Sequence, residues 1–348
     1  MSPTTLAITT LSLGLGTTIT FTSSHWLLAW MGLEINTLAI LPLMSHNQHP
    51  RAIETAIKYF LTQAVSTAVL LFAAIMNAWA SGEWDINSLH TPLSASLVTL
   101  ALALKVGLAP LHLWLPEVLQ GLTLTTGLIL ATWQKLAPFA LLIQVSPAAS
   151  PALLMTLGIT SAFLGAWGGL NQTQLRKIMA YSSIANLGWM FIALKFAPSL
   201  TLLMLGLYVL TTVAIFLMLK TYHSTTFNNL ALRGPNDPCL LAALLLSLLS
   251  LAGLPPLTGF APKWLIIEQL TKQEMLIPAF LLIVAALLNL YVYLRICYVA
   301  ALTSSPCPNA AFPTWRLQPA QNTLLMTSTI TITLAALPLI PLAFSLVL

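Results

Sequence analysis

Long apolar stretches follow one another along almost the whole chain, and charged residues seldom interrupt them. Of 348 residues, 58% are hydrophobic, whereas Asp, Glu, Lys and Arg together make up 6%. A soluble domain carries a charge on roughly one residue in four, because a folded globule needs polar side chains on its surface. The composition therefore excludes a water-soluble globule and indicates a protein that folds in the lipid bilayer.

The apolar stretches are long enough to cross a membrane as helices. One span needs about 20 residues, and its backbone must form its own hydrogen bonds because lipid offers none. The short alternating segments of a membrane β-barrel are not found in the sequence. We therefore predict an all-α polytopic membrane protein whose eleven helices cover about 3–22, 26–44, 54–80, 92–115, 122–145, 151–170, 175–195, 199–222, 238–270, 275–300 and 322–346.

Loop charges predict the orientation of a single transmembrane domain, residues 1–348. The side that bears the N-terminus collects seven cations, whereas the other side holds only Lys195 and Lys272. By the positive-inside rule the N-terminus faces the positive-inside compartment, and an odd number of spans places the C-terminus opposite. This count treats 238–270 as one interrupted span. The seven cations are Arg51, Arg176, Lys177, Lys220, Arg233, Arg295 and Arg316.

One motif occurs twice. Residues 107–116 and 253–262 repeat Gly, Leu, Pro, Leu and Pro at a constant offset of 146 residues. The ninth helix comes five spans after the fourth, and this odd offset means that the two copies cross the membrane in opposite directions. We therefore expect approximate inverted repeats over 1–145 and 151–300, as in many transporters, followed by the helix 322–346. Proline removes a backbone donor and breaks a helix, and the released carbonyls must lie in protein or water. The alternative to a repeat is that the two motifs are proline kinks that arose by chance. The expected breaks lie at Pro110, Pro255 and Pro256.

Once the charges in loops or near helix ends are set aside, five charged residues remain inside predicted spans. A charge near the bilayer centre costs at least about 2.5 kcal/mol. Such a residue persists where it faces water, a counter-ion or a function. Lys58 follows Glu54 by four residues near a helix start, so we interpret it as half of a structural ion pair. The other four are placed inside the bundle: Glu34, Lys105, Lys135 and Lys263.

Buried lysines are suited to proton relay. Burial lowers the pKa of an amine from about 10.4 toward neutrality and a nearby carboxylate raises it again. Two charges about 7 Å apart interact by roughly 2 kcal/mol at an effective dielectric near 20, enough to move a proton. We therefore hypothesise a relay through Glu34, Lys105, Lys135 and Lys263, with His112 as a possible bridge between Lys105 and Lys135. The alternative is a structural Glu34–Lys105 pair that fixes helix register.

Motifs for cofactors and metals are missing from the sequence. Cys239, Cys297 and Cys307 form no CxxC pair and have no histidine at ligand spacing. Gly14-Leu-Gly16 opens like a dinucleotide-binding loop, but no strand precedes it and the third glycine is missing. We therefore expect no cofactor or metal in this chain, and nothing in the sequence predicts nucleic-acid binding.

Four motifs occur in the order and spacing of a known family. They are SHWLLAWMGLEIN at 24–36, WQKLAP at 133–138, GLNQTQLRKIMAYSS at 169–183 and GLPPLTGFAPKW at 253–264. Through them the chain resembles, over essentially its whole length, the NADH dehydrogenase subunit 2 family of animal mitochondria. It is similar to the shortened animal form, which lacks three N-terminal helices of the bacterial homologues.

The resemblance implies a proton-pumping, antiporter-like subunit in the membrane arm of respiratory complex I. By motif position, Glu34 would be the helix-two glutamate, Lys105 the lysine of the first broken helix, Lys135 the central lysine and Lys263 the lysine of the second broken helix. The chain would belong to a proton-translocating NADH:ubiquinone reductase without holding a redox centre. NADH, FMN, iron–sulfur clusters and ubiquinone would bind to partner subunits.

The resemblance also implies a location and partners. The protein would lie in the mitochondrial inner membrane, with its N-terminus on the matrix side and its C-terminus on the intermembrane-space side. Its partners would be membrane lipids and other membrane-arm subunits, including neighbouring antiporter-like ones. Two alternatives are a stand-alone cation/proton antiporter subunit and a structural spacer whose buried charges only hold helices in place.

Overall fold

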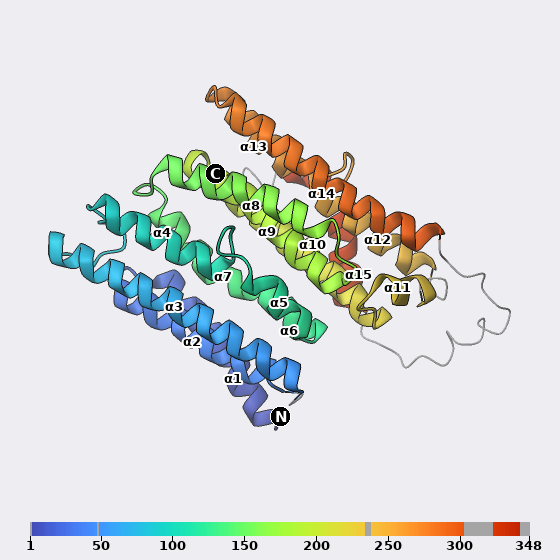
Figure 1. Ribbon diagram of the computed structural model, residues 1–348, viewed down its shortest axis with the longest axis horizontal. Coiled ribbons are helices and arrows are strands. Elements are labelled where there is room, and N and C mark those ends of the chain that lie inside the picture. The colour runs from blue at the N-terminus through green and yellow to red at the C-terminus, as the bar shows by residue number, and fades with distance from the viewer. Residues whose placement is uncertain (1, 47–48, 234–237, 303–322, 342–348) are drawn as a thin grey trace. The chain divides into compact units, whose positions relative to one another are not determined.

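The protein is built from helices. The computed structural model describes residues 2–46, 49–233, 238–302 and 323–341, and within these ranges the regular elements are helical, with no β-strand (Figure 1). The chain divides into two compact units. The first comprises Met1–Ser161 with Phe191–Pro198, and the second comprises Ala162–Met190 with Ser199–Leu348.

The helices follow the apolar stretches of the sequence. Those of the first unit are α1 (Pro3–Thr22), α2 (Trp26–Met44), α3 (Pro50–Ser81), α4 (Pro92–Val106), α5 (Trp114–Gly121), α6 (Leu124–Ala131) and α7 (Trp133–Val145). Two helices contribute to both units, α8 (Pro151–Gly169) and α9 (Leu175–Phe196). Those of the second unit are α10 (Pro198–Tyr222), α11 (Phe227–Arg233), α12 (Pro238–Ala252), α13 (Phe260–Lys272), α14 (Leu276–Leu302), α15 (Leu324–Ala335) and the 3₁₀ turn η4 (Leu337–Leu339).

Proline and capping side chains set many helix starts. Pro3 and Pro50 occupy the first turns of α1 and α3, where the missing N–H has no intrahelical partner to lose. The Ser2 hydroxyl accepts a hydrogen bond from the Thr5 N–H, and the His49 ring nitrogen Nδ1 accepts one from the Arg51 N–H. These local signals explain why α1 begins at the predicted residue and α3 begins four residues before its predicted start.

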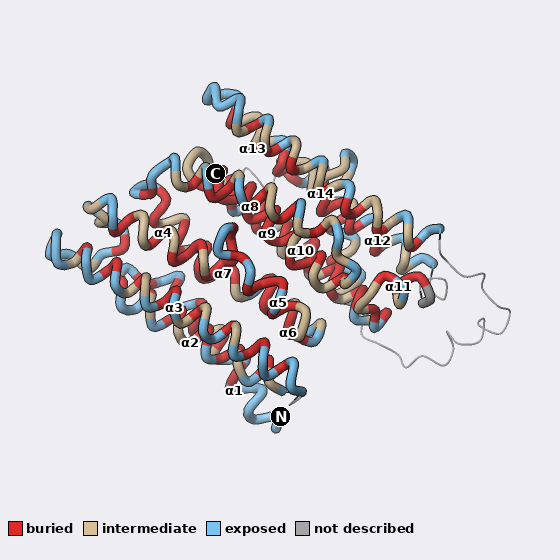
Figure 2. Tube along the Cα trace, viewed as in Figure 1, coloured by how far each residue is buried: buried red, intermediate tan, exposed pale blue. Residues whose placement is uncertain are grey.

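The surface of the helices is apolar. Seven helical segments are long and apolar enough to cross a membrane, and α4, α12 and α15 are shorter apolar helices. Exposed residues recur along the length of the helices rather than only at their ends (Figure 2), and they include Leu61 on α3 and Leu287 on α14. Lipid can cover such side chains at little cost, whereas water cannot. The prediction of an all-α, multi-pass membrane protein is confirmed.

Three predicted spans are interrupted. The span predicted over 92–115 ends at Val106, and the chain resumes a helix at Trp114. The span predicted over 238–270 divides into α12 and α13. The span predicted over 122–145 divides at Thr132, an unpredicted break, where the threonine hydroxyl donates to the Leu128 carbonyl at 2.7 Å. Such back-bonding competes with the backbone and bends helices.

Two further expectations need correction. The short helix α11 was not predicted, because seven residues carry too little hydrophobic periodicity to be recognised. The helix predicted over 322–346 is present as α15 and η4, while residues 322 and 342–346 lie outside the described residues. Cys307 and Arg316 also lie outside them.

Helices α1 and α2 approach each other through glycines. A Cβ atom at Gly16 would lie 2.5 Å from Asn36 Oδ1 and 2.9 Å from the Gly32 carbonyl oxygen. A Cβ atom at Gly32 would likewise lie 2.6 Å from Thr20 Cγ2. Small residues at both positions let the two backbones pack closely, as is common between membrane helices. This contact fixes the position of the Asn36 side chain.

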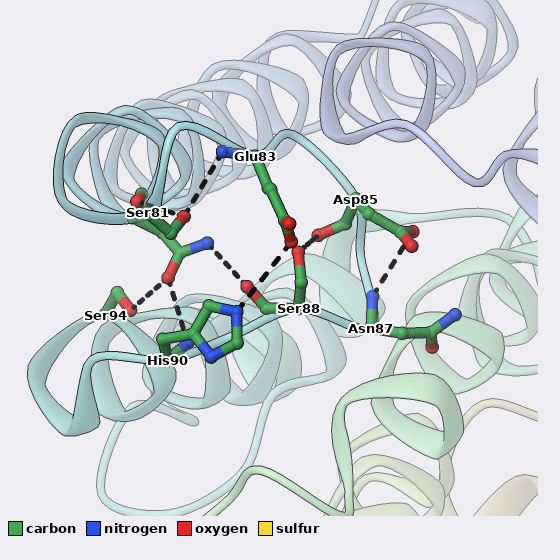
Figure 3. A network of polar contacts seen from close by, with 8 residues as sticks. Ser81, Glu83, Asp85, Asn87, Ser88, His90 and Ser94 are labelled. Carbon is green, nitrogen blue, oxygen red and sulfur yellow. Dashed lines mark hydrogen bonds and ion pairs between the residues drawn. The ribbon is translucent and has the colours of Figure 1, made fainter.

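The polar network that precedes α4 holds the α3–α4 connection in place (Figure 3). Asn77 donates from Nδ2 to the Ser88 carbonyl at 2.8 Å and accepts at Oδ1 from the His90 N–H at 3.2 Å. The Glu83 Oε2 and His90 Nε2 atoms lie 3.8 Å apart. Because Ser94 in the first turn of α4 also bonds to Asn77 Oδ1, this network sets where α4 enters the unit.

We expect Gly107→Ala to destabilise the protein. Gly107 follows α4 with φ at +87°, and an added Cβ atom would lie 2.9 Å from Leu115 Cδ1. A non-glycine residue in this conformation costs about 1–2 kcal/mol. The midpoint of thermal denaturation of the purified protein should fall. Gly14→Ala is the matched control, because an added Cβ atom at Gly14 would point into open space. Equal midpoints for the two variants would contradict this account.

Candidate functional site

The two copies of the repeated motif adopt the same backbone arrangement. Gly107 has φ at +87° and Gly253 has φ at +89°. The Gly107 N–H donates to the Ala103 carbonyl at 2.9 Å, and the Gly253 N–H donates to the Leu249 carbonyl at 3.2 Å. Both donor and acceptor positions are therefore related by the offset of 146 residues. Pro110 and Pro256 occupy equivalent positions in the two copies, and the peptide bond before each of them is cis.

Side chains supply donors to the carbonyls at the first break. The Trp114 indole N–H donates to the Leu104 carbonyl at 3.1 Å, and Gln63 Nε2 lies 3.5 Å from the Lys105 carbonyl. These carbonyls belong to the last turn of α4, which has no following helical turn to bond to. The break is thereby kept within the protein without use of the Lys105 ammonium group.

At the second break, a lysine side chain supplies the hydrogen-bond donors to the backbone carbonyls. Lys263 Nζ donates to the Leu251 carbonyl at 2.8 Å and to the Ala252 carbonyl at 2.9 Å. A cation at the C-terminal end of a helix is also favoured by the helix dipole. Leu251 lies at the offset of 146 from Lys105. The two breaks therefore present a lysine in different ways.

Lys105 and Lys135 line one internal cavity. Both are buried, at 6% and 4% exposure. The cavity measures about 20 Å³, and a single water molecule requires about 10–15 Å³. The other polar side chains around it are neutral: Asn36, Thr37, Tyr59, Gln63, Trp114 and Gln134. The two amines therefore border a shared space whose described lining contains no carboxylate.

Glu34 and His112 are not among the residues that line this cavity. The Glu34 carboxylate is within electrostatic reach of Lys105 and Tyr59. Its Oε2 atom is buried and receives no hydrogen bond from the residues that the structure describes. His112 is buried at the first break, where its carbonyl accepts from the Leu115 N–H at 3.0 Å.

A second cavity, which Lys263 helps to line, lies in the other unit. Lys263 is buried, and its polar neighbours in the lining come from three helices. Asn186 lies on α9, Tyr208 and Thr211 lie on α10, and Ser250 lies on α12. This cavity also measures about 20 Å³. Each unit therefore contains a small space lined by a buried lysine and neutral polar groups.

Lys58 has a different environment, as predicted. Its Nζ atom lies 2.8 Å from a carboxylate oxygen of Glu54 and 2.8 Å from one of Glu117, and its side chain is 43% exposed. The predicted Glu54–Lys58 pair is confirmed, and Glu117 was missed as its second partner. Because Glu117 lies on α5, the pair also ties α3 to the segment after the first break. Glu117 lies 146 residues before Lys263, so the offset between the two motif copies could have identified it in the sequence.

Sequence reasoning also missed the neutral lining of the cavities. It searched the spans for charges and passed over uncharged polar residues, of which Asn36, Gln63, Gln134 and Asn186 are buried or line a cavity. A search for amides within apolar stretches could have found them. Over the described ranges, no group of three or more His, Cys, Asp or Glu residues is placed to hold a metal ion.

The fold and the paired breaks define an antiporter-like membrane subunit. Residues 23–289 match the family described as NADH:quinone oxidoreductase/Mrp antiporter, transmembrane, and residues 290–344 match the family described as NADH dehydrogenase subunit 2 C-terminus. The chain belongs to the NADH dehydrogenase subunit 2 family within these antiporter-like proteins. The family resemblance predicted from the four motifs is therefore confirmed.

Known proteins resemble this chain over nearly its full length. NADH-ubiquinone oxidoreductase chain 2 is 58% identical in Scyliorhinus canicula, over 98% of each chain, and 59% identical in Oncorhynchus mykiss, also over 98% of each chain. A chain of respiratory complex I from Thermus thermophilus, solved with bound aureothin, matches with a TM-score of 0.85 at 28% identity, covering 99% of this chain and 80% of that one. A chain of the Mrp complex from Dietzia shares the fold, with a TM-score of 0.81 at 15% identity, covering 97% of this chain and 76% of that one.

We expect Trp114→Phe to weaken the first break. The substitution keeps an aromatic ring but removes the donor to the Leu104 carbonyl, at a cost of about 1 kcal/mol. Thermal denaturation of the purified protein should begin at a lower temperature. Trp264→Phe is the matched control, because Trp264 is an exposed tryptophan just after the second break. A decrease no larger than that of the control would contradict the assigned role.

Proposed function

We propose that this chain is a core membrane-arm subunit of NADH:ubiquinone oxidoreductase and translocates protons through buried Lys, Glu and His residues and water. The observation that carries the proposal is that Lys105 and Lys135, from different helices, line the same internal cavity. A water molecule there can accept a proton from one ammonium group while it donates another to the neighbouring amine. The chain's residues thereby exchange protons without any covalent change.

Glu34 biases this exchange by its charge. An ionised carboxylate stabilises a positive charge on Lys105, and loss or displacement of that carboxylate releases the proton toward Lys135. Interaction of this kind amounts to roughly 2 kcal/mol at about 7 Å and an effective dielectric near 20. Moving one charge against 100 mV requires about 2.3 kcal/mol. A small number of such coupled steps therefore supplies the free energy needed for each proton.

Lys263 and His112 complete the proposed relay. Lys263 serves the second cavity, and its two backbone acceptors hold its amine in place. His112 acts at the first break, beside the cavity that holds Lys105 and Lys135. The approximate inverted repeats over 1–145 and 151–300 give each half one such break, which is consistent with the shared backbone arrangement of the two motifs.

The driving redox chemistry belongs to partner subunits in this proposal. NADH, FMN, iron–sulfur clusters and ubiquinone bind there, and this chain holds no redox centre. The protein lies in the mitochondrial inner membrane beside other antiporter-like subunits, with its N-terminus toward the matrix and its C-terminus toward the intermembrane space. Co-purification with redox subunits and rotenone-sensitive NADH oxidation distinguish this assembly from a stand-alone cation/proton antiporter.

We expect Lys135→Met and Lys105→Met to impair proton pumping. Methionine preserves the length and apolar part of the side chain but cannot carry a proton. In the assembled complex reconstituted into vesicles, the initial rate of proton uptake driven by NADH should fall by about tenfold or more.

Lys58→Met is the matched control. It also removes a lysine from an apolar helix, but from a half-exposed ion-pair cluster outside both cavities. Its pumping rate should match that of the parent complex. Parental pumping by the Lys105 and Lys135 variants would instead favour a structural spacer.

A further inference from the structure

Each cavity contains a buried asparagine whose amide is not fully hydrogen-bonded. Asn36 is 2% exposed, and neither its Nδ2 nor its Oδ1 atom has a hydrogen-bond partner among the described residues. Asn186 is 3% exposed, and its Nδ2 atom likewise has none within the described chain. Buried amides are almost always hydrogen-bonded, so each such exception requires an explanation.

The amides lie where a water molecule fits. Asn36 lines the cavity of Lys105 and Lys135, and Asn186 lines the cavity of Lys263. Each space measures about 20 Å³, and one water requires about 10–15 Å³ and two to four polar partners. An amide and an amine supply such partners. The same combination of lysine, asparagine and small polar space therefore occurs once in each unit.

Close helix packing prevents the Asn36 side chain from turning toward another partner. A Cβ atom at Gly16 would lie 2.5 Å from Asn36 Oδ1, which means that α1 already contacts this amide closely. Gln134 Nε2 donates to the Asn36 backbone carbonyl at 3.2 Å, which ties α2 to the helix of Lys135. The amide is thereby held at a fixed place beside both lysines.

The helix of Asn186 is held in a comparable way. A Cβ atom at Gly165 on α8 would lie only 2.5 Å from the backbone nitrogen of Ala185, the residue before Asn186. Backbone contact of this kind fixes α9 against α8 at that level. The first two helices of each expected repeat, α1 with α2 and α8 with α9, therefore use glycine to immobilise an asparagine that faces a lysine cavity.

We propose that Asn36 and Asn186 are positioning residues that each hold a water molecule against the lysine of their cavity. A carboxamide both donates and accepts hydrogen bonds, so it can orient water for proton transfer in either direction. It does not ionise and so never takes the proton from the relay. This inference rests on the proposed proton translocation, but it assigns a task to two uncharged residues outside the lysine–glutamate set.

The test compares Asn36→Leu with Asn36→Ser in the assembled complex in vesicles. Leucine is close to asparagine in size and removes the hydrogen-bonding groups, whereas serine retains a donor and an acceptor. We expect NADH-driven proton uptake to fall about tenfold in the leucine variant, the effect of losing one ordinary hydrogen bond in the transfer step, and to recover at least in part in the serine variant. Asn186→Leu and Asn186→Ser should behave in the same way.

Controls separate positioning from packing. Ile40→Leu alters an equally buried site one turn beyond Asn36 on α2, outside the cavity, and should leave pumping unchanged. NADH oxidation with an artificial electron acceptor reports whether the redox subunits remain assembled. Equal losses in the leucine and serine variants would assign the asparagines to packing and overturn the proposal.

Two further outcomes are decisive. Parental pumping by Asn36→Leu and Asn186→Leu, alongside impaired pumping by Lys135→Met, would overturn this inference and leave the proposed function standing. Parental pumping by Lys135→Met would overturn the proposed function itself. If the leucine variants do not assemble, a map of the parent complex that resolves water decides: density within about 2.7–3.2 Å of the amide of each asparagine supports the proposal, and its absence there overturns it.

Discussion

Backbone carbonyls released at helix breaks are the constraint on which the rest of this structure depends. A continuous membrane helix satisfies its own backbone, but α4 and α12 both end within an apolar stretch. The carbonyls of their last turns must find donors inside the protein, because lipid provides none. Polar side chains must therefore be brought to each break, and their presence creates a polar interior in a chain that is otherwise almost uncharged.

The two units meet this constraint with different residues. In the first, the donors are the Trp114 indole and the Gln63 amide, both neutral. In the second, the donor is the Lys263 ammonium group itself. Lys105 thus lies on α4, the helix that ends at the first break, and lines a cavity. Lys263 lies on α13, after the second break, and its amine donates to carbonyls at the end of α12. A neutral Lys263 would donate more weakly to those carbonyls, so its protonation state is linked to the stability of the break, which is not so for Lys105.

The sequence was informative wherever a single signal dominates. Apolar length predicted most helix bounds, and the 146-residue offset located two breaks whose glycines share a left-handed backbone. The break at Thr132 was missed because one threonine hydroxyl bonding to Leu128 has no distinctive pattern. The neutral lining of the cavities was missed for another reason. An amide in a span costs less than a charge, and only packing shows whether Asn36 meets Lys105 or a lipid chain.

Charge environment separates the lysines of this chain into two kinds. Lys58 contacts two carboxylates at 2.8 Å and lies half-exposed, so its positive charge is held in place by fixed counter-charges. Lys105 and Lys135 face amides and a phenol instead. A direct carboxylate partner would stabilise the ammonium form so strongly that the proton would rarely leave. In the proposed relay, neutral partners support both forms of the amine, and Glu34, placed outside the lining, shifts the balance without forming a permanent pair. A lysine that must change its charge is therefore better surrounded by asparagine, glutamine and tyrosine than by acids.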